Sequence, residues 1–146
     1  MFEGSYQESS LLASDVMTPN PRTCSEFSTV LEAVLIFRDA NCGAVPVLEN
    51  GKPVAILTDR DVALAVADEA NLATTPVSEI VTAGVVCIAD DAPLSEVREK
   101  FATAGVRRLL VVDAKGQLVG IISLADISEI ISNHELGEVV AEIVRN

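Results

Sequence analysis

The sequence contains few of the residues on which enzymes and metal sites most often depend. Among its 146 residues there is one histidine, His134, and there is no G-x-x-x-x-G-K-[ST] motif. No serine or cysteine sits in a recognisable nucleophile setting, and no group of side chains has the spacing of a metal site. The sequence therefore predicts no catalytic residue and no metal ligand.

Cysteine is scarce, and basic residues are outnumbered. The three cysteines are an odd number without C-x-x-C spacing, which argues against a disulfide framework or a zinc site. Cys24 and Cys87 lie in apolar runs and are expected to be buried thiols. Ten basic residues against 22 acidic ones give a formal net charge of −12, which leaves no basic patch for nucleic acid or an anionic membrane surface. An anionic ligand therefore needs a local cation or helix amides.

Long apolar runs are also missing, although 49% of the residues are hydrophobic. No run approaches the roughly 20 residues that span a bilayer. The first five residues lack the basic segment and the apolar core of a signal peptide. We therefore expect a cytoplasmic globular protein, with no membrane contact and ample apolar material for a core.

A duplication is the main feature that the sequence does contain. An offset of 64 residues places Val47 on Val111, and one added residue in the following turn of the second copy then places Thr58 on Ser123. A single insertion over about fifty residues indicates a duplicated unit. The expected division is an N-terminal segment (1–14), repeat 1 (15–67), a connector (68–76), repeat 2 (77–132) and a C-terminal helix (133–146).

Each copy shows the pattern strand, helix, strand, strand, helix. This predicts an α/β (α+β) fold of two βαββα repeats related by a pseudo-twofold axis. Short helices are expected at 11–17, where repeat 1 begins, and at 77–81, the start of repeat 2. The expected strands are 22–24, 44–48 and 54–57 in repeat 1 and 85–88, 106–112 and 118–122 in repeat 2; the expected helices are 28–40, 58–66, 93–104 and a last one from residue 123.

The C-terminal segment carries an apolar stripe with helical spacing, made of Leu136, Val139, Val140, Ile143 and Val144. Charged residues lie between these positions, so the segment predicts an amphipathic helix. The helix has two candidate roles: it packs on its own subunit, or it contributes to a homodimer interface.

One short motif occurs at the same place in both copies, where the third strand meets the last helix. It consists of a hydroxyl residue followed three residues later by a carboxylate: Thr58 and Asp61, then Ser123 and Asp126. The pattern is typical of a capping box. A helix start also offers amide hydrogens to a phosphate, and a carboxylate one turn in can accept hydrogen bonds from a ribose diol. Because the motif recurs inside a larger repeat, we expect a ligand role in addition to capping.

With these motifs, the chain resembles a tandem cystathionine-beta-synthase (CBS) domain pair, also called a Bateman module, over about residues 15–132. The resemblance implies a non-catalytic regulatory pair that binds adenosine nucleotides or S-adenosylmethionine in clefts between the two halves and often forms a homodimer. The residues that carry the resemblance are Asp15–Pro19, Gly43–Val47, Val54–Asp61, Gly105–Asp113 and Leu118–Asp126.

The resemblance also implies roles for individual residues. Asp61 and Asp126 correspond to acceptors for the ribose diol, and Thr58 and Ser123 to hydroxyls that face ribose or phosphate. The residues implied near the base are Thr23 and Cys24 in repeat 1 and Cys87 and Ile88 in repeat 2, with Val47 and Val111 as walls. The residues implied for the phosphates are Arg107, Arg108 and Arg60.

Two differences between the copies predict unequal sites. In the family, a glycine usually precedes the two apolar residues of the third strand. This position is Gly120 in repeat 2 but Ala55 in repeat 1, and the alanine is a handicap if the backbone must approach a ligand closely. Arg107–Arg108 in repeat 2 correspond to Gly43–Ala44 in repeat 1. We therefore expect the site of repeat 2, with Arg108, to bind a phosphate more strongly than the site of repeat 1.

Two functions fit these expectations. The first is a regulatory module that binds ligands of the AMP, ADP and ATP class, or S-adenosylmethionine, and signals to an unidentified effector protein. The second is a structural or dimerisation module whose degenerate pockets bind no ligand. The sequence does not decide between them.

Overall fold

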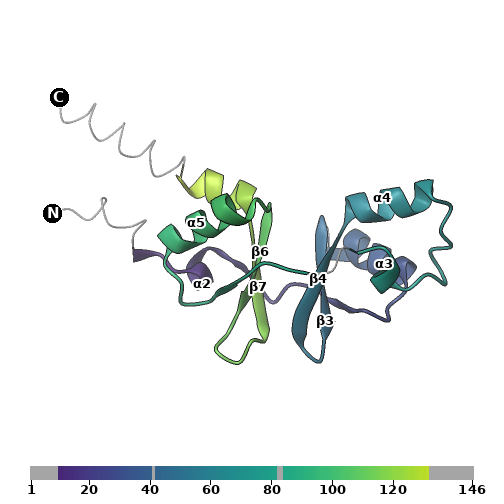
Figure 1. Ribbon diagram of the computed structural model, residues 1–146, viewed down its shortest axis with the longest axis horizontal. Coiled ribbons are helices and arrows are strands. Elements are labelled where there is room, and N and C mark those ends of the chain that lie inside the picture. The colour runs from purple at the N-terminus through teal and green to yellow at the C-terminus, as the bar shows by residue number, and fades with distance from the viewer. Residues whose placement is uncertain (1–9, 41, 82–83, 132–146) are drawn as a thin grey trace. The chain divides into compact units, whose positions relative to one another are not determined.

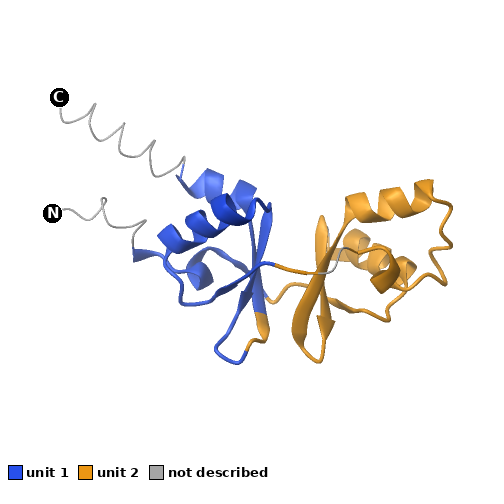
Figure 2. Ribbon diagram, viewed as in Figure 1, with its two compact units in different colours: residues 1–19, 86–115, 119–146 blue, residues 20–85, 116–118 orange. Residues whose placement is uncertain are grey.

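The computed structural model describes residues 10–40, 42–81 and 84–131. It divides into two compact units (Figure 2). Unit 1 comprises residues 1–19, 86–115 and 119–146, and unit 2 comprises residues 20–85 and 116–118. The predicted C-terminal amphipathic helix lies outside the described residues.

Unit 2 contains a three-stranded sheet in the order β2-β3-β4. β2 (Cys24–Ser25) runs parallel to β3 (Ala44–Glu49), and β3 runs antiparallel to β4 (Lys52–Thr58). Asn50 and Gly51 join β3 to β4 with φ values of 55° and 80°, and two successive positive φ values are what a tight type I′ hairpin turn requires.

Two helices, α3 and α4, lie on one face of this sheet (Figure 1). α3 (Val30–Ala40) begins after the turn that follows β2, and α4 (Asp59–Ala67) begins where β4 ends. The backbone N–H groups of Val30 and Leu31 donate to the carbonyls of Thr75 and Leu72, both at 2.9 Å. The predicted connector therefore caps the start of α3.

Unit 1 contains a four-stranded sheet in the order β1-β7-β6-β5, in which β5 and β6 are parallel and β1 and β7 antiparallel. Its helices lie on one face of the sheet (Figure 1). The strands are β1 (Thr18–Pro19), β5 (Cys87–Ala89), β6 (Arg108–Val112) and β7 (Leu118–Ser123); the helices are α2 (Ala13–Val16), α5 (Leu94–Ala104) and a helix over residues 124–131.

Each unit has a buried apolar core of its own. Alternate residues of a strand point to the same face, so Val45 and Val47 of β3 and Ala55 and Leu57 of β4 enter the core of unit 2 together. In unit 1 the same role falls on Leu109 and Val111 of β6, and α5 contributes three further buried side chains, Leu94, Val97 and Phe101. Burying one such large side chain contributes roughly 1.5–3 kcal/mol. Within the described residues, no helix combines the length and the apolar character needed to cross a bilayer.

The leading segment of each repeat packs in the unit built from the other repeat. The amide of Ala13 donates to the carbonyl of Ala92, and the amide of Val77 donates to the carbonyl of Ser28, both at 2.8 Å. The two bonds are equivalent, because an offset of 64 residues relates Ala13 to Val77 and Ser28 to Ala92. Each compact unit of the structure therefore combines most of one sequence repeat with the leading segment of the other.

Strand register follows the predicted repeat. Cys24 pairs with Val47 across β2 and β3, and Ile88 pairs with Val111 across β5 and β6. Both residues of the second pair lie 64 positions after those of the first. The mixed α/β fold of two repeats is thus confirmed.

Several predicted element boundaries were wrong. The expected helix at 77–81 is a single 3-10 turn, η2 (Val77–Glu79). The expected strand at 106–112 begins two residues later, because α5 ends at Gly105 in the left-handed conformation (φ 65°) and the chain must then turn back. The pairing of the two-residue strand β1 with β7 was not predicted, since it joins residues about a hundred positions apart.

Candidate functional site

The helix over residues 124–131 begins directly after β7, and its first turn has few unused amides. The Oγ of Ser123 accepts a hydrogen bond from the amide of Asp126 at 3.0 Å. The amide of Leu124 donates to the carbonyl of Arg107 at 2.8 Å. The first amides of a helix lack intrahelical acceptors, and no described residue outside the helix supplies an acceptor to the amide of Ala125. This helix start is suited to an anion.

The carboxylate of Asp126 is available at the same helix start. The Asp126 residue is exposed, and its contact with Ser123 uses the backbone amide rather than the side chain. Among the described residues, no donor or cation occupies the Asp126 carboxylate oxygens. An external group with two hydroxyl donors could therefore bind to it without displacing a contact from the described residues.

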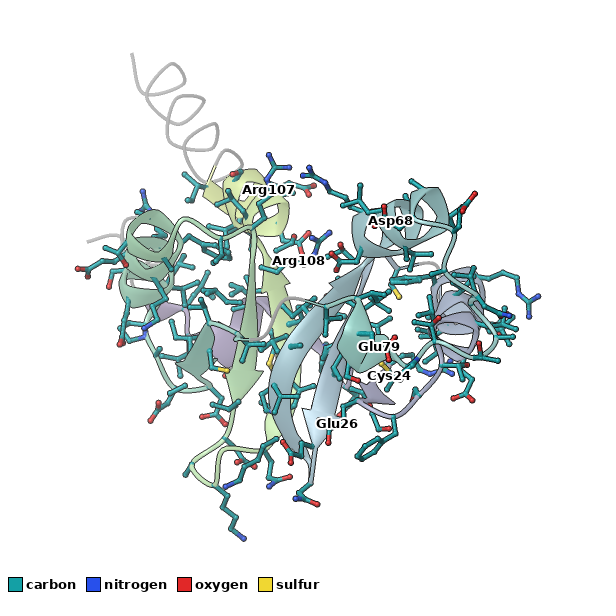
Figure 3. All side chains as sticks on the ribbon, turned by 45° about the vertical axis from the view of Figure 1, so that its right-hand side comes forward. Cys24, Glu26, Asp68, Glu79, Arg107 and Arg108 are labelled. Carbon is teal, nitrogen blue, oxygen red and sulfur yellow. The ribbon has the colours of Figure 1, made fainter. Side chains whose placement is uncertain are left out.

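Two arginines accompany this helix start. Arg107 directly precedes β6 and is exposed, and Arg108 is the first residue of β6 and is half-buried. The hydrogen bond from Leu124 to the Arg107 carbonyl fixes the beginning of β6 next to the helix start, and Figure 3 shows both arginines at that end of the strand. No carboxylate of the described residues forms an ion pair with either guanidinium. Unit 1 therefore brings together a hydroxyl, a carboxylate and two cations.

The equivalent helix start in unit 2 has the same backbone but different side-chain contacts. The amide of Asp59 donates to the carbonyl of Gly43 at 3.3 Å, which corresponds to the bond between Leu124 and Arg107. The Oγ1 of Thr58 accepts from the amide of Asp61 at 3.2 Å, and the Oδ2 of Asp61 accepts from the amide of Thr58 at 2.9 Å. Thr58 and Asp61 thus form a complete capping box, as predicted, whereas a ligand role for them stays a prediction.

Repeat 1 also has fewer cations near its helix start. Gly43 and Ala44 stand where repeat 2 has its two arginines. Arg60 lies in the first turn of α4 and is exposed. It is a positively charged side chain near the helix start of repeat 1. The predicted electrostatic difference between the repeats is therefore present in the structure of each unit.

The residues implied near the base lie on β2 and β5 and on the strands beside them, except Thr23, which directly precedes β2. The side chains of Cys24, Val47, Ile88 and Val111 belong to the buried cores. Thr23 and Cys87 are half-buried. A base at these strands would therefore meet mainly backbone groups.

The cysteines of these strands are poor nucleophiles. Burial, together with the nearby negative charge of Glu32, raises the pKa of the Cys24 thiol to about 11. Burial also raises the pKa of Cys87, an effect that the positive charge of Lys100 partly opposes. Since the thiolate is the reactive form, both thiols are protonated and unreactive at neutral pH. Across the described ranges, no three His, Cys, Asp or Glu side chains gather as a metal site.

Gly120 makes room for the side chain of Met17. A Cβ atom added at Gly120 would overlap the Sδ of Met17 and would lie 2.8 Å from its Cγ. Met17 comes from the leading segment, which β1 attaches to β7 through the pairing of Pro19 with Gly120. Met17 is therefore the group that approaches Gly120 closely, and the handicap considered for Ala55 stays a prediction.

The CBS domain family matches residues 13–68 and 77–133. The chain therefore belongs to the CBS domain family and is a tandem CBS pair, a class of regulatory, non-catalytic modules. It is 35% identical over 130 residues to the CBS domain-containing protein YhcV of Bacillus subtilis (strain 168), covering 88% of this chain and 92% of YhcV.

Two solved CBS pairs are similar in structure. The CBS domain pair of protein MJ0100, in complex with 5′-methylthioadenosine and S-adenosyl-L-methionine, has a TM-score of 0.73 and 28% sequence identity, and the match covers 84% of this chain and 97% of that one. The CBS domain protein PAE2072 from Pyrobaculum aerophilum, complexed with AMP, has a TM-score of 0.69 and 25% identity, and the match covers 80% of this chain and 89% of that one. All three bound molecules contain adenosine or a derivative of it.

Proposed function

We propose that this chain is a regulatory module that binds an adenosine-containing ligand of the AMP, ADP and ATP class and forms a homodimer that signals to an effector protein. The observation that carries the proposal is the grouping of Ser123, Asp126 and the two arginines around one helix start in unit 1. MJ0100 and PAE2072 support it, because each is a CBS pair with an adenosine-containing molecule bound.

The chemistry of the group matches the parts of a nucleotide. The carboxylate of Asp126, which has no partner among the described residues, can accept two hydrogen bonds from a ribose diol. The guanidinium groups of Arg107 and Arg108 can bind phosphate oxygens, and such charge-assisted bonds are about twice as strong as neutral ones. The net charge of −12 disfavours binding of an anion elsewhere on the chain. We therefore expect the phosphate to bind at these two arginines. A phosphate-bearing ligand should therefore bind more tightly than S-adenosylmethionine, whose sulfonium is positive.

Repeat 1 should bind the ligand more weakly than repeat 2, or not at all. Its carboxylate, Asp61, already accepts a hydrogen bond from Thr58, and a ligand would have to compete with that contact. This observation favours, for repeat 1, the second candidate function, a structural module without a ligand. We propose that repeat 2 binds first and that repeat 1 contributes at higher concentrations.

Thermal unfolding in the presence of a ligand panel tests the proposal. AMP, ADP, ATP, NADH and S-adenosylmethionine are added in turn to the full chain, with inorganic phosphate at equal ionic strength as the control. A ligand at 100 times its dissociation constant stabilises the folded state by about 2.7 kcal/mol, which should raise Tm by roughly 5–10 °C. We expect the largest rise with an adenine nucleotide. An unchanged Tm across the panel would support the ligand-free structural module instead.

A further inference from the structure

We propose that Met17 is a site of reversible oxidation, at which a peroxide converts the thioether to a sulfoxide and thereby loosens the leading segment, residues 10–19, from the rest of unit 1. The sulfur forms a bond to one oxygen of hydrogen peroxide and loses two electrons, while the O–O bond breaks and the other oxygen leaves as water. Two thiols reverse the step, because they take up the added oxygen as water and become a disulfide.

The side chain of Met17 lies directly on the backbone of β7. A Cβ atom added at Gly120 would overlap the Met17 Sδ, and it would lie 2.8 Å from the Cγ and 3.0 Å from the Cβ of Met17. Gly120 is buried, whereas Met17 is half-buried, so the sulfur packs closely on the strand and a small oxidant can still reach the residue. A sulfoxide is more polar and larger than a thioether, and it cannot keep this close apolar contact.

The strand that attaches the leading segment to β7 is short. β1 consists of Thr18 and Pro19, which pair with Ile121 and Gly120. Pro19 has no N–H group to donate, and α2, which precedes this strand, is four residues long. The apolar contact of Met17 is therefore a substantial part of the attachment at β7, and its loss should make local opening of the segment easier.

Two of the three thiols are poor competitors for a peroxide. Peroxides attack the thiolate of a cysteine, and burial raises the pKa of Cys24 to about 11 and also raises the pKa of Cys87. A thioether needs no deprotonation, so Met17 stays reactive at neutral pH. The chain has one further methionine, Met1, which lies outside the described residues. Cys42 is half-buried, and a control variant below removes its thiol.

Unit 2 shows that the fold does not require this sulfur. An offset of 64 residues relates Met17 to Val81, and the residue equivalent to Gly120 is Ala55. Val81 packs against the core of unit 2, to which Ala55 belongs. Unit 1 thus combines a long side chain with a glycine, where unit 2 combines a shorter side chain with an alanine. Because the second combination has no oxidisable atom, packing alone does not explain the methionine.

Hydrogen exchange of the full chain, before and after treatment with hydrogen peroxide, tests the proposal. The amide of Ala13 donates to the carbonyl of Ala92, and the amide of Ser14 donates to that of Asp90, so both amides report on the leading segment. After oxidation they should exchange at least ~10-fold faster. The amide of Val77, which forms the equivalent bond in unit 2, should keep its rate. Methionine sulfoxide reductase with dithiothreitol should restore the original rates at Ala13 and Ser14.

Three variants identify the atom responsible. Met17→Val with Gly120→Ala gives unit 1 the pair that unit 2 already carries, and its exchange rates should not respond to peroxide. Met17→Leu is a second variant without the sulfur, and it should not respond either. Cys42→Val gives repeat 1 the residue of repeat 2 at the equivalent position, and it should respond as the wild-type protein does. Circular dichroism checks that each variant is folded.

Tandem mass spectrometry locates the added oxygen, which should lie on Met17. Four results would each overturn the proposal. These are oxidation of another residue in place of Met17, an oxygen on Met17 without faster exchange at Ala13 and Ser14, equal acceleration at Val77, and a peroxide response in a folded variant that lacks the Met17 sulfur.

Discussion

Replacing Asp126 with alanine should lower the affinity for AMP by at least ~10-fold, because a hydrogen bond to a charged group contributes about 1.5–3 kcal/mol. The stability of the protein should change little. The Asp126 carboxylate has no partner among the described residues, and the cap of the helix depends on the Oγ of Ser123 instead. Isothermal titration calorimetry measures the affinity, and denaturant unfolding measures the stability.

The matched control is the same substitution at Asp61, which should have the opposite pattern of effects. Its carboxylate accepts from the amide of Thr58, so Asp61→Ala should reduce the free energy of unfolding by about 1 kcal/mol, as loss of a helix cap does. The AMP affinity of the higher-affinity site should stay near the wild-type value. Loss of binding in Asp61→Ala but not in Asp126→Ala would contradict the unequal sites.

Replacing Gly120 with alanine should destabilise the fold by about 1–3 kcal/mol, the usual effect of one extra methyl group in a packed region. The new Cβ would overlap Met17, and the leading segment that carries Met17 would have to move away from β7. Denaturant unfolding of the full chain measures the change.

A double substitution shows whether Met17 is the cause. Met17→Ala with Gly120→Ala should cost less than the sum of the two single substitutions, because the smaller side chain makes room for the added methyl group. If Gly120→Ala kept wild-type stability and lost AMP binding, the glycine would serve ligand approach rather than the packing of Met17.

The repeat was the part of the fold that the sequence predicted best. Equivalent residues such as Val47 and Val111 share an offset of 64, and the structure pairs them with equivalent partners, Cys24 and Ile88. A duplicated unit must use the same hydrogen-bond register twice, so internal similarity contains information about strand pairing. Periodicity in a single copy could not have supplied it.

The exchange of leading segments was not predicted, for a physical reason. The pattern of apolar residues at 11–17 shows that the segment buries one face, but it does not show which core receives that face. The bond between Ala13 and Ala92 joins residues that are far apart in sequence. The contact between Gly120 and Met17 was not predicted for the same reason, since Met17 lies about a hundred residues earlier.

The sequence indicated which residues to consider for the candidate site, but not how their side chains are arranged. The same four-residue pattern marks both helix starts, and sequence alone makes Asp61 and Asp126 equivalent. The structure separates them, because the Asp61 side chain closes a capping box and the Asp126 side chain does not. Side-chain conformation decides this difference, and a pattern of residue types carries no information about it.

Backbone amide chemical shifts during an AMP titration of the isotopically labelled full chain test the central claim most directly. The account predicts that the largest changes fall on Leu124, Ala125 and Asp126, with smaller changes at Asp59–Asp61 that saturate at higher concentration. No change in the first group, or larger and earlier changes in the second, would contradict it.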